Sequence, residues 1–413
     1  MKSMKKPWER RLDDLAQIIR NCSVTYFQPN LFRQNVNQFL QTSRTITFIL
    51  QKNKNDIPEF NNWYTTNVKD KWSQDKVMTW AKNARNKIEK QGDLEINSTL
   101  ELALISSYLS EDDIEIQCGP EELLNGDVKR LIKHARQKIP KSFHAATGLK
   151  IERNWICAEL DEYELLHALS YVYARVYECC DRVAQLIGSR MPESIAEPST
   201  IANKCVIDRY IQLVKLSDKK TYYTNSVSRV YRREDMIDTK LKNEMDSVVQ
   251  ACDTPTDFGS AVQLHENMAI RIFEKNGYHQ NTLFFLKKDW SPMYFCATVF
   301  ADRIDKYYFW RMMGDHAHVE QPHGVVFVGE IWDRDSSAVA LGSAIDDMPI
   351  RGEALNLISF DRDANICQTR WKINRNIFGE PRLETAERLM KLSELGMLVP
   401  VMRGMGVDPD NFT

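Results

Sequence analysis

The sequence predicts a mixed fold, in which a helical-bundle N-terminal domain is followed by an α+β region with an antiparallel or mixed sheet. Three observations carry this prediction. Apolar residues recur every three or four positions from Pro7 to about Lys90, which is the period of amphipathic helices. The segment 161–188 repeats that pattern over a long, well-bounded stretch. Beyond residue 256, short β-branched and aromatic runs alternate with helical patterns, which is typical of a compact α+β domain.

The N-terminal domain, residues 1–92, is expected to contain three helical regions. Pro7 stands at a first helical position, and Asn30 is expected to cap the second region. Pro58 opens the third region, which ends at Gly92. Three tryptophans of this region are expected to anchor helix packing: Trp63, Trp72 and Trp80.

The middle region, residues 93–190, is expected to form α/β structure that ends in a long helix. Asp161 is the expected N-cap of that helix, because Glu164 stands at the capping-box offset. In chain order the region predicts extended structure, a helix, a short strand and the long helix: 94–118, 120–138, 149–157 and 161–188.

The C-terminal α+β domain, residues 200–413, is expected to hold a sheet of four or five strands. A hairpin is expected to join 210–214 to 222–231. The strands expected after it are 282–286, 293–299, 324–332, 354–360 and 366–373. The expected helices are 236–251, 257–276, 302–313 and 383–395.

Composition and charge indicate a globular protein with no dominant partner class. The formal net charge of −2 gives no global reason to expect nucleic acid or an anionic membrane as partner. Nine scattered cysteines lack metal-ligand spacing and are expected to be free thiols in a reducing compartment. No run approaches the roughly 20 apolar residues of a membrane span. We therefore expect a cytoplasmic protein without a cofactor or a membrane partner.

The segment from Trp80 to Lys90, together with the preceding helix 32–50, resembles the HEPN superfamily of helical bundles. The resemblance rests on Arg85 followed by Asn86 near the end of a long helix, and it covers roughly residues 10 to 92. Many members of that family are metal-independent ribonucleases of bacterial defence systems. Their arginine stabilises phosphate charge, and a histidine that follows it after four to six intervening residues moves protons.

The position of that histidine is taken by Lys90, Gln91 and Gly92 in this sequence. A lysine ammonium with a pKa near 10.4 cannot replace an imidazole with a pKa near 6.5 in proton transfer at neutral pH. The resemblance therefore implies a catalytically degenerate domain around Arg85, Asn86 and Lys90. It also implies a bacterial defence or stress setting, an RNA or protein partner, and a homodimer through the N-terminal helices.

A metal site is the next hypothesis, because His316 and His318 form a His-x-His pattern among carboxylates. The segment is expected to be a loop between a helix and a strand, with Glu320 and His323 nearby. A polar surface loop is the alternative interpretation. A third ligand is expected from one of three carboxylates: Asp302, Glu330 or Asp333.

Nucleic-acid contact is the third hypothesis, because Tyr231 lies among three arginines: Arg229, Arg232 and Arg233. Surfaces that bind single-stranded nucleic acid combine aromatic and arginine side chains in this way. A second basic cluster covers residues 129–138, and solvated charge is the alternative interpretation of both clusters. Arg130 and His134 in this cluster share a helical face and form a competing arginine–histidine pair, with a spacing one residue short of the HEPN pattern. Nuclease chemistry is a further alternative, based on four carboxylates that lack the expected lysine partner: Glu330, Asp346, Asp347 and Glu353.

The sequence thus favours a binding or regulatory protein and leaves open whether it is an enzyme. The alternatives are a metal-independent ribonuclease acting through Arg85 and Asn86, and a metal-dependent hydrolase built on His316 and His318. These hypotheses make different demands on the fold. The first needs a ribose-phosphate pocket beside residue 85, and the second needs three converging ligands.

Overall fold

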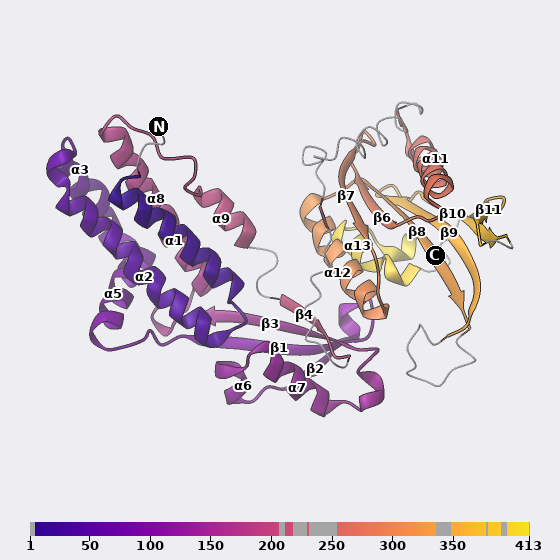
Figure 1. Cartoon of the computed structure of the whole chain (residues 1–413), viewed down its shortest axis with the longest axis horizontal. Helices are drawn as coiled ribbons and strands as arrows, with labels where there is room; N and C mark the ends of the chain where they lie inside the picture. Colours follow the sequence, from indigo (N-terminus) through magenta and orange to yellow (C-terminus); the bar gives the residue numbers. More distant parts are fainter. Residues whose placement is uncertain are drawn as a thin grey trace. The chain divides into compact units, whose positions relative to one another are not determined.

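The computed structural model describes residues 5–205, 211–217, 229–230, 254–335, 348–376, 379–389 and 395–412. The chain divides into two compact units. The first unit comprises Met1–Ala103, Glu115–Lys138 and Leu149–Gln212, and the second comprises Leu104–Ile114, Ile139–Gly148 and Leu213–Thr413. A helical N-terminal region followed by a region of antiparallel strands confirms the predicted fold class (Figure 1).

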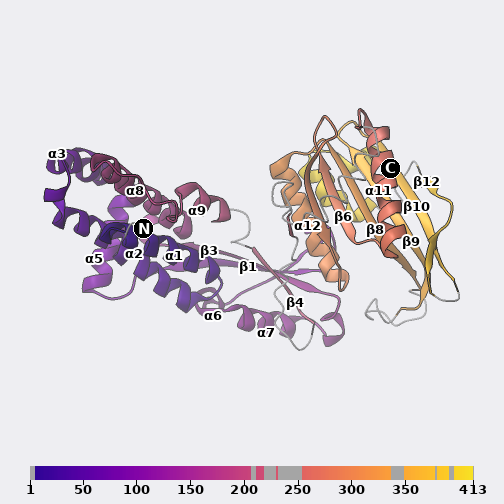
Figure 2. The same cartoon turned by 45° about the horizontal axis from the view of Figure 1, so that its top comes forward.

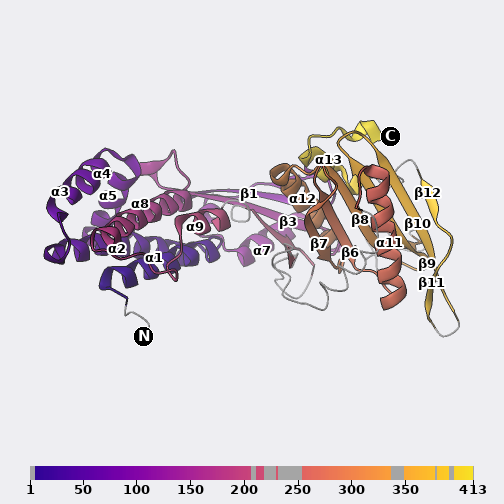
Figure 3. The ribbon, with the colours of Figure 1, turned by 90° about the horizontal axis from the view of Figure 1, so that it is seen from above.

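The first unit is a bundle built on four long helices. They lie side by side in Figures 1 and 3 and share one buried apolar core. The apolar stripe predicted for each helix faces this core, where Leu12, Phe39 and Leu169 are fully buried. The helices are α1 (Pro7–Val24), α2 (Pro29–Lys52), α5 (Lys76–Lys90) and α8 (Leu165–Leu186), with the shorter α9 (Pro198–Cys205) following α8.

The third helical region is divided into shorter pieces. Before α5 come α3 (Phe60–Tyr64), the π-helical turn η2 (Thr65–Asp70) and α4 (Lys71–Gln74). The division before α5 has a local cause, since Asp75 is extended and its carboxylate accepts the backbone N–H of Met78 at 3.0 Å. The predicted tryptophan anchors are confirmed: Trp80 is buried, and Trp63 and Trp72 pack against the core.

The long helix α8 begins later than predicted. Residues Ala158–Leu160 form a 3-10 turn, η5, so Asp161 lies before the helix. Glu164 is the N-cap instead, and its carboxylate accepts the backbone N–H of His167 at 2.9 Å. The end is as predicted, with Gly188 in the left-handed region at φ 68°.

A four-stranded sheet has the order β2-β1-β3-β4. Its strands are β1 (Asn97–Ile105), β2 (Ile114–Ile116), β3 (Gly148–Ile156) and β4 (Ile211–Lys215). The predicted helix at 120–138 is two helices, α6 (Pro120–Asn125) and α7 (Val128–Lys138). They separate at Gly126, where a side chain would meet the carbonyl oxygen of Glu122.

An eight-stranded sheet forms the centre of the second unit, and its strands pair antiparallel throughout the described residues. Its order is β11-β10-β9-β8-β6-β7-β5, with β12 also paired to β10. The five strands predicted after residue 280 are all present: β6 (Asn281–Leu286), β7 (Pro292–Thr298), β8 (Gly324–Arg334), β9 (Ile350–Asp361) and β10 (Ile366–Arg375).

Both faces of this sheet are covered by helices (Figure 2). Along β8, Val325 and Phe327 pack with α12 (Arg303–Glu320) and α13 (Val399–Gly404), whereas Val326 and Val328 pack with α11 (Phe258–Asn276). Neighbouring side chains of a strand point to opposite faces, so a continuous apolar run fills two cores at once.

The second unit differs from the sequence prediction in four respects. The sheet has three further strands, β5 (Arg229–Val230), β11 (Pro381–Leu383) and β12 (Glu387–Leu389). The closing helix expected at 383–395 is wrong where the structure describes it, because β11 and β12 pair with β10 there. The hairpin is also wrong in its described part, since β5 pairs with β7. Finally, α12 extends to Glu320, while the helix predicted at 236–251 lies outside the described residues.

The described residues also show the state of the cysteines and the character of the helices. The seven cysteines described there are free, and all except Cys118 are buried. Among the helices that the structure describes, none is long and apolar enough to cross a membrane.

The buried imidazole of His265 on α11 predicts a pH-dependent stability. Burial lowers the pKa of His265, whose Nδ1 lies 2.8 Å from the carbonyl oxygen of Ala261 and whose ring packs on Phe284. Below about pH 6.5 the unfolded state binds a proton at this residue that the folded state excludes. The free energy of unfolding should therefore decrease as pH falls, by up to about 1.4 kcal/mol per pH unit.

Urea unfolding at about pH 7.5 and about pH 5.5 measures this effect. The variant His265→Leu should lose less stability between the two pH values than the natural protein. The exposed His318→Gln serves as a control and should keep the natural pH dependence. Equal pH dependence in His265→Leu and the natural protein would contradict the assignment.

Candidate metal centre

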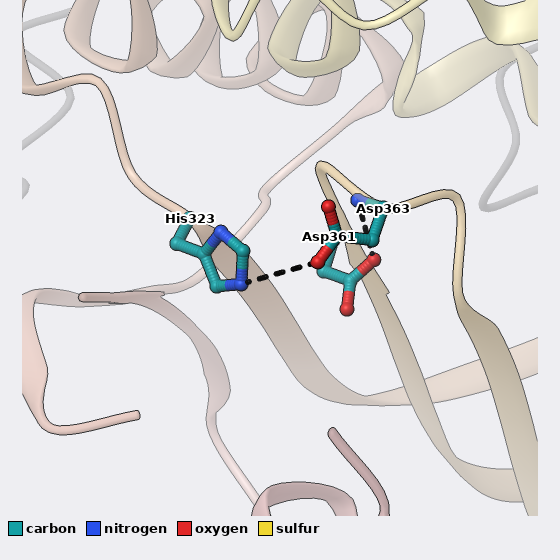
Figure 4. A group of neighbouring side chains, drawn as sticks. All are labelled: His323, Asp361 and Asp363. Carbon is teal, nitrogen blue, oxygen red and sulfur yellow. Dashed lines mark hydrogen bonds and ion pairs between the residues drawn. The ribbon is translucent and has the colours of Figure 1, made fainter. Parts of the chain in front are cut away.

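Three side chains of types that ligate metals meet at one end of the eight-stranded sheet, as Figure 4 shows. His323 precedes β8, Asp361 is the last residue of β9, and Asp363 lies in the turn to β10. The register pairs Gly324 of β8 with Asp361, which places the residue before β8 beside the end of β9. The sheet therefore determines this cluster, although 38 positions of sequence separate its first two members.

The spacing of the ligand atoms suits one metal ion. One atom from each of the three residues lies within 4.8 Å of the other two, and His323 Nε2 is 3.8 Å from Asp363 Oδ2. Metal–ligand bonds to imidazole and carboxylate are about 2.0–2.4 Å, so two ligands of one ion are at most about 4.8 Å apart. Small side-chain movements would bring all three groups to one ion.

Asp361 is the fully buried member of the cluster. Its Oδ1 accepts the backbone N–H groups of Asp363 and Asn365, both at 2.9 Å. Its Oδ2 accepts the side-chain amide of Asn365 at 2.8 Å. A carboxylate offers about four lone-pair positions, so one position on Oδ2 stays available for a metal.

The charge of Asp361 has no cationic side chain to balance it within the described part of the chain. The adjacent Arg362 directs its guanidinium elsewhere, donating to the carbonyl oxygen of Pro322 at 2.8 Å and to the side chain of Gln321. Buried charges in proteins are usually paired with an opposite charge or bound to a metal. A cation between Asp361 and His323 would supply that balance.

His323 is held in place through its own backbone. Its N–H donates to the carbonyl oxygen of Leu286 at 2.9 Å, and its carbonyl oxygen accepts the N–H of Arg362 at 3.0 Å. The imidazole packs edge-on against Trp290, with ring centroids 5.1 Å apart. The side chain of Asp363 is 73% exposed, so the cluster is open to water on that side.

The two histidines predicted from sequence as metal ligands lie outside this cluster, on a helix. His316 and His318 belong to α12, so the expected loop is wrong. Residues two apart on a helix point about 200° apart and do not face each other. The ring of His316 stacks on Tyr294 at 5.6 Å, and His318 is exposed.

The carboxylates proposed as third ligands have structural partners. Asp302 caps α12 and pairs with Lys215 at 2.8 Å, and Asp333 pairs with Arg370. Glu330 accepts the backbone N–H of His279 at 2.6 Å, and burial raises its pKa. Glu353 pairs with Arg375, while 346 and 347 lie outside the described residues.

Sequence reasoning missed Asp361 and Asp363 and named His323 only as a neighbour. The available signal was an Asp-x-Asp pattern directly after a predicted strand, together with a histidine directly before another. Its significance depends on β8 and β9 being adjacent in the sheet, which the sequence pattern does not determine.

The residues of the Arg85 hypothesis lie on two sides of α5. The guanidinium of Arg85 bonds to Asn86 at 3.2 Å, lies 3.6 Å from Glu89 and stacks over Phe48. Asn86 and Lys90 line an open polar cleft of about 790 Å³ along α5, together with Trp80 and other residues. Arg85 is not among the residues that line this cleft.

The basic groups proposed for nucleic-acid contact are only partly described. Arg229 lies on β5, but its side chain and the whole of residues 232 and 233 are outside the described residues. On α7, Arg130 pairs with Glu121 at 2.7 Å, and His134 Nε2 lies 3.0 Å from the carbonyl oxygen of Gln117. Arg130 and His134 are thus engaged by separate partners.

Comparison with known proteins identifies similar phage proteins. The family described as "Bacteriophage lambda protein ea47" matches residues 5–397. A curated relative, "Protein ea47" of Escherichia phage lambda, is 38% identical over 410 residues, which cover 98% of each chain. No solved structure matches.

These matches overturn the HEPN resemblance. The family match extends across nearly the whole chain, whereas the HEPN interpretation covered residues 10–92 through a motif without its histidine. An arginine followed by asparagine on an amphipathic helix is a common surface arrangement, and here Arg85 has an ordinary ion-pair partner in Glu89. The ribonuclease alternative rested on that resemblance and loses its basis.

Proposed function

The chain belongs to the family of bacteriophage lambda protein ea47, and from its structure we propose that it is a phage protein of binding type that holds a divalent cation at His323, Asp361 and Asp363. One observation supports this most directly. Asp361 is a fully buried carboxylate without a cationic side-chain partner in the described residues, and an imidazole and a second carboxylate lie within reach of the same ion.

The donor set favours a first-row transition metal. Imidazole suits Zn²⁺, Fe²⁺ and similar ions, whereas Ca²⁺ prefers a shell of six to eight oxygens. One imidazole with two carboxylates fits Zn²⁺ or Mn²⁺, and water would complete the shell on the exposed side of Asp363.

Binding at this position would join three parts of the second unit. The ion would link the residue before β8 to the end of β9 and to the turn that follows it. A ligand that binds only the folded state stabilises it by about 2.7 kcal/mol at a concentration of 100 times its Kd. The proposed role is therefore a cation-dependent stabilisation of this end of the sheet.

Titration of chelator-treated protein with Mn²⁺ and Zn²⁺, by calorimetry and by thermal unfolding, tests the proposal. One equivalent of metal should bind and raise the unfolding temperature. Asp363→Asn is the most informative variant, because the exposed side chain leaves the fold intact, and it should weaken binding roughly tenfold to a hundredfold. His323→Gln should have a similar effect.

Variants of the two α12 histidines are matched controls. His316→Gln and His318→Gln should bind metal with the affinity of the natural protein. Loss of binding in those two variants but not in His323→Gln would transfer the site to the pair first suggested by the sequence. Absence of stoichiometric binding would remove the cation from the proposed function.

We propose two further properties of a binding-type protein. They are an RNA or protein partner and a homodimer through the N-terminal helices. Analytical ultracentrifugation measures the second directly, and the first is developed below for one surface of the first unit.

A further inference from the structure

The helix α7 concentrates positive charge in a chain that is otherwise balanced. Its eleven residues, Val128–Lys138, contain no aspartate or glutamate. They contain five lysines and arginines and one histidine: Lys129, Arg130, Lys133, His134, Arg136 and Lys138. The whole chain has 55 basic and 57 acidic residues, so this density belongs to one surface.

The apolar face of α7 is already occupied. Val128, Leu131, Ile132 and Ala135 are buried, and they hold the helix on the first unit. Just before the helix, the carbonyl oxygen of Gly126 accepts a hydrogen bond from Arg153 of β3 at 2.7 Å. A basic amphipathic helix binds a membrane by inserting its apolar face, and that face is not available here.

Three lysines of α7 have no ion-pair or hydrogen-bond partner within the part of the chain that is described. Lys129, Lys133 and Lys138 are all exposed, whereas Arg130 is neutralised by Glu121. Lys129 and Lys133 are four residues apart and share a helical face, about 6 Å apart along the axis. The solvent side of the helix therefore presents Lys129 and Lys133 as neighbouring unpaired ammonium groups, and the exposed Lys138 extends the positive charge to the end of the helix, about 140° around the axis from Lys133.

The placement of Lys129 and Lys133 does not favour the helix itself, whereas Lys138 lies in the last turn, where the helix dipole favours a cation. Lys129 lies in the first turn, where the positive end of the helix dipole disfavours a cation by about 0.3–1 kcal/mol. Like charges at positions four apart, such as Lys129 and Lys133, destabilise a helix by a further few tenths of a kcal/mol. Charges placed against local stability indicate a partner that uses them.

We propose that α7 binds the phosphate backbone of nucleic acid through Lys129, Lys133 and Lys138. Lysine ammonium groups neutralise phosphates without reading bases, so this contact is independent of sequence. The contact lies entirely on the first unit and does not depend on the proposed cation site of the second.

Fluorescence anisotropy with a labelled duplex of about 20 base pairs, as DNA and as RNA, tests the proposal. If three phosphates are neutralised, affinity should fall about 40-fold as salt rises from about 50 to about 200 mM. The triple variant Lys129→Gln, Lys133→Gln, Lys138→Gln should lower the salt slope by about 2.7 and weaken binding at least tenfold. Binding of one duplex type only would identify the source of the phosphate backbone.

The matched control changes three other exposed lysines of the first unit, Lys54→Gln, Lys69→Gln and Lys82→Gln, which leaves the same net charge as the α7 variant. It should retain the affinity and salt slope of the natural protein. An equal loss in the control would show attraction by overall charge and overturn the proposal. The proposal is also overturned if the protein binds neither duplex. In that case, α7-dependent binding to vesicles containing phosphatidylserine would identify an anionic membrane as the partner instead. Circular dichroism confirms that each variant is folded.

Discussion

Replacing Asp113 by asparagine is expected to destabilise the second unit by about 3–5 kcal/mol. Asp113 and Arg311 of α12 form a two-bond ion pair, with Nη1–Oδ2 at 2.7 Å and Nη2–Oδ1 at 2.8 Å. Both side chains are largely buried, at 9% exposure for Asp113 and 14% for Arg311. Removing the carboxylate charge leaves the guanidinium buried without a counter-ion, which is the most damaging way to break such a pair.

The guanidinium of Arg311 cannot easily find another partner. Its Nη2 already donates to the carbonyl oxygens of Ser107 at 2.9 Å and Leu109 at 2.6 Å, and its Nε is buried without a hydrogen bond. The bonds to the 107–109 segment fix this segment against α12, so the loss of Asp113 also weakens the contact that orders it. Hydrogen exchange should therefore increase along α12 and along 107–113.

Hydrogen-exchange mass spectrometry and urea unfolding measure the expected change. Glu111→Gln is the control, because Glu111 pairs with Arg403 at 2.7 Å while both side chains are about half exposed. An exposed pair contributes about 0–1 kcal/mol, so this variant should remain near the natural stability. A loss of less than 1 kcal/mol in Asp113→Asn would show that the buried pair is not required.

Much of this fold could be predicted because its signals are local. The period of three to four residues identified α1, α2 and α8, and the five β-branched runs after residue 280 are the five long strands of the sheet. The error at 383–395 has a tertiary cause. The segment 383–395 contains good helix formers, yet β11 and β12 pair with an available edge of β10, and tertiary pairing overrides helix propensity.

The candidate site was less predictable than the fold because it depends on which strands are neighbours. His316 and His318 form a His-x-His pattern that suggests a metal site, but both lie on α12, where residues two apart point in different directions. His323 and Asp361 lie in separate segments of the sequence, and they meet only because β8 and β9 pair with Gly324 opposite Asp361. The ion pair between Arg311 and Asp113 could not be predicted from sequence for the same reason, since 198 positions separate the two residues.

Replacing Gly404 by alanine is expected to destabilise the second unit by about 3 kcal/mol. Gly404 of α13 lies against Gly314 of α12, and a Cβ at Gly404 would lie 2.1 Å from the carbonyl oxygen of Gly314. Gly314 is also tightly packed, because a Cβ at Gly314 would lie 2.6 Å from the carbonyl oxygen of Pro400 in α13. The obstacle is backbone on both sides, so no side-chain rotation can relieve it.

Steric contact, rather than backbone conformation, is the reason for this effect. Gly404 does not have a positive φ, so alanine can adopt its conformation and the substitution isolates the helix–helix approach. Gly396→Ala is the matched control, since no atom lies within 4 Å of its added Cβ, and its stability should change by less than about 0.5 kcal/mol. Urea unfolding of the two variants makes the comparison. Equal stability of Gly404→Ala and Gly396→Ala would mean that α12 and α13 are farther apart in solution. The packing of Met402 and Val401 beneath the sheet would then need another explanation, because the close approach of the two helices positions α13 over that core.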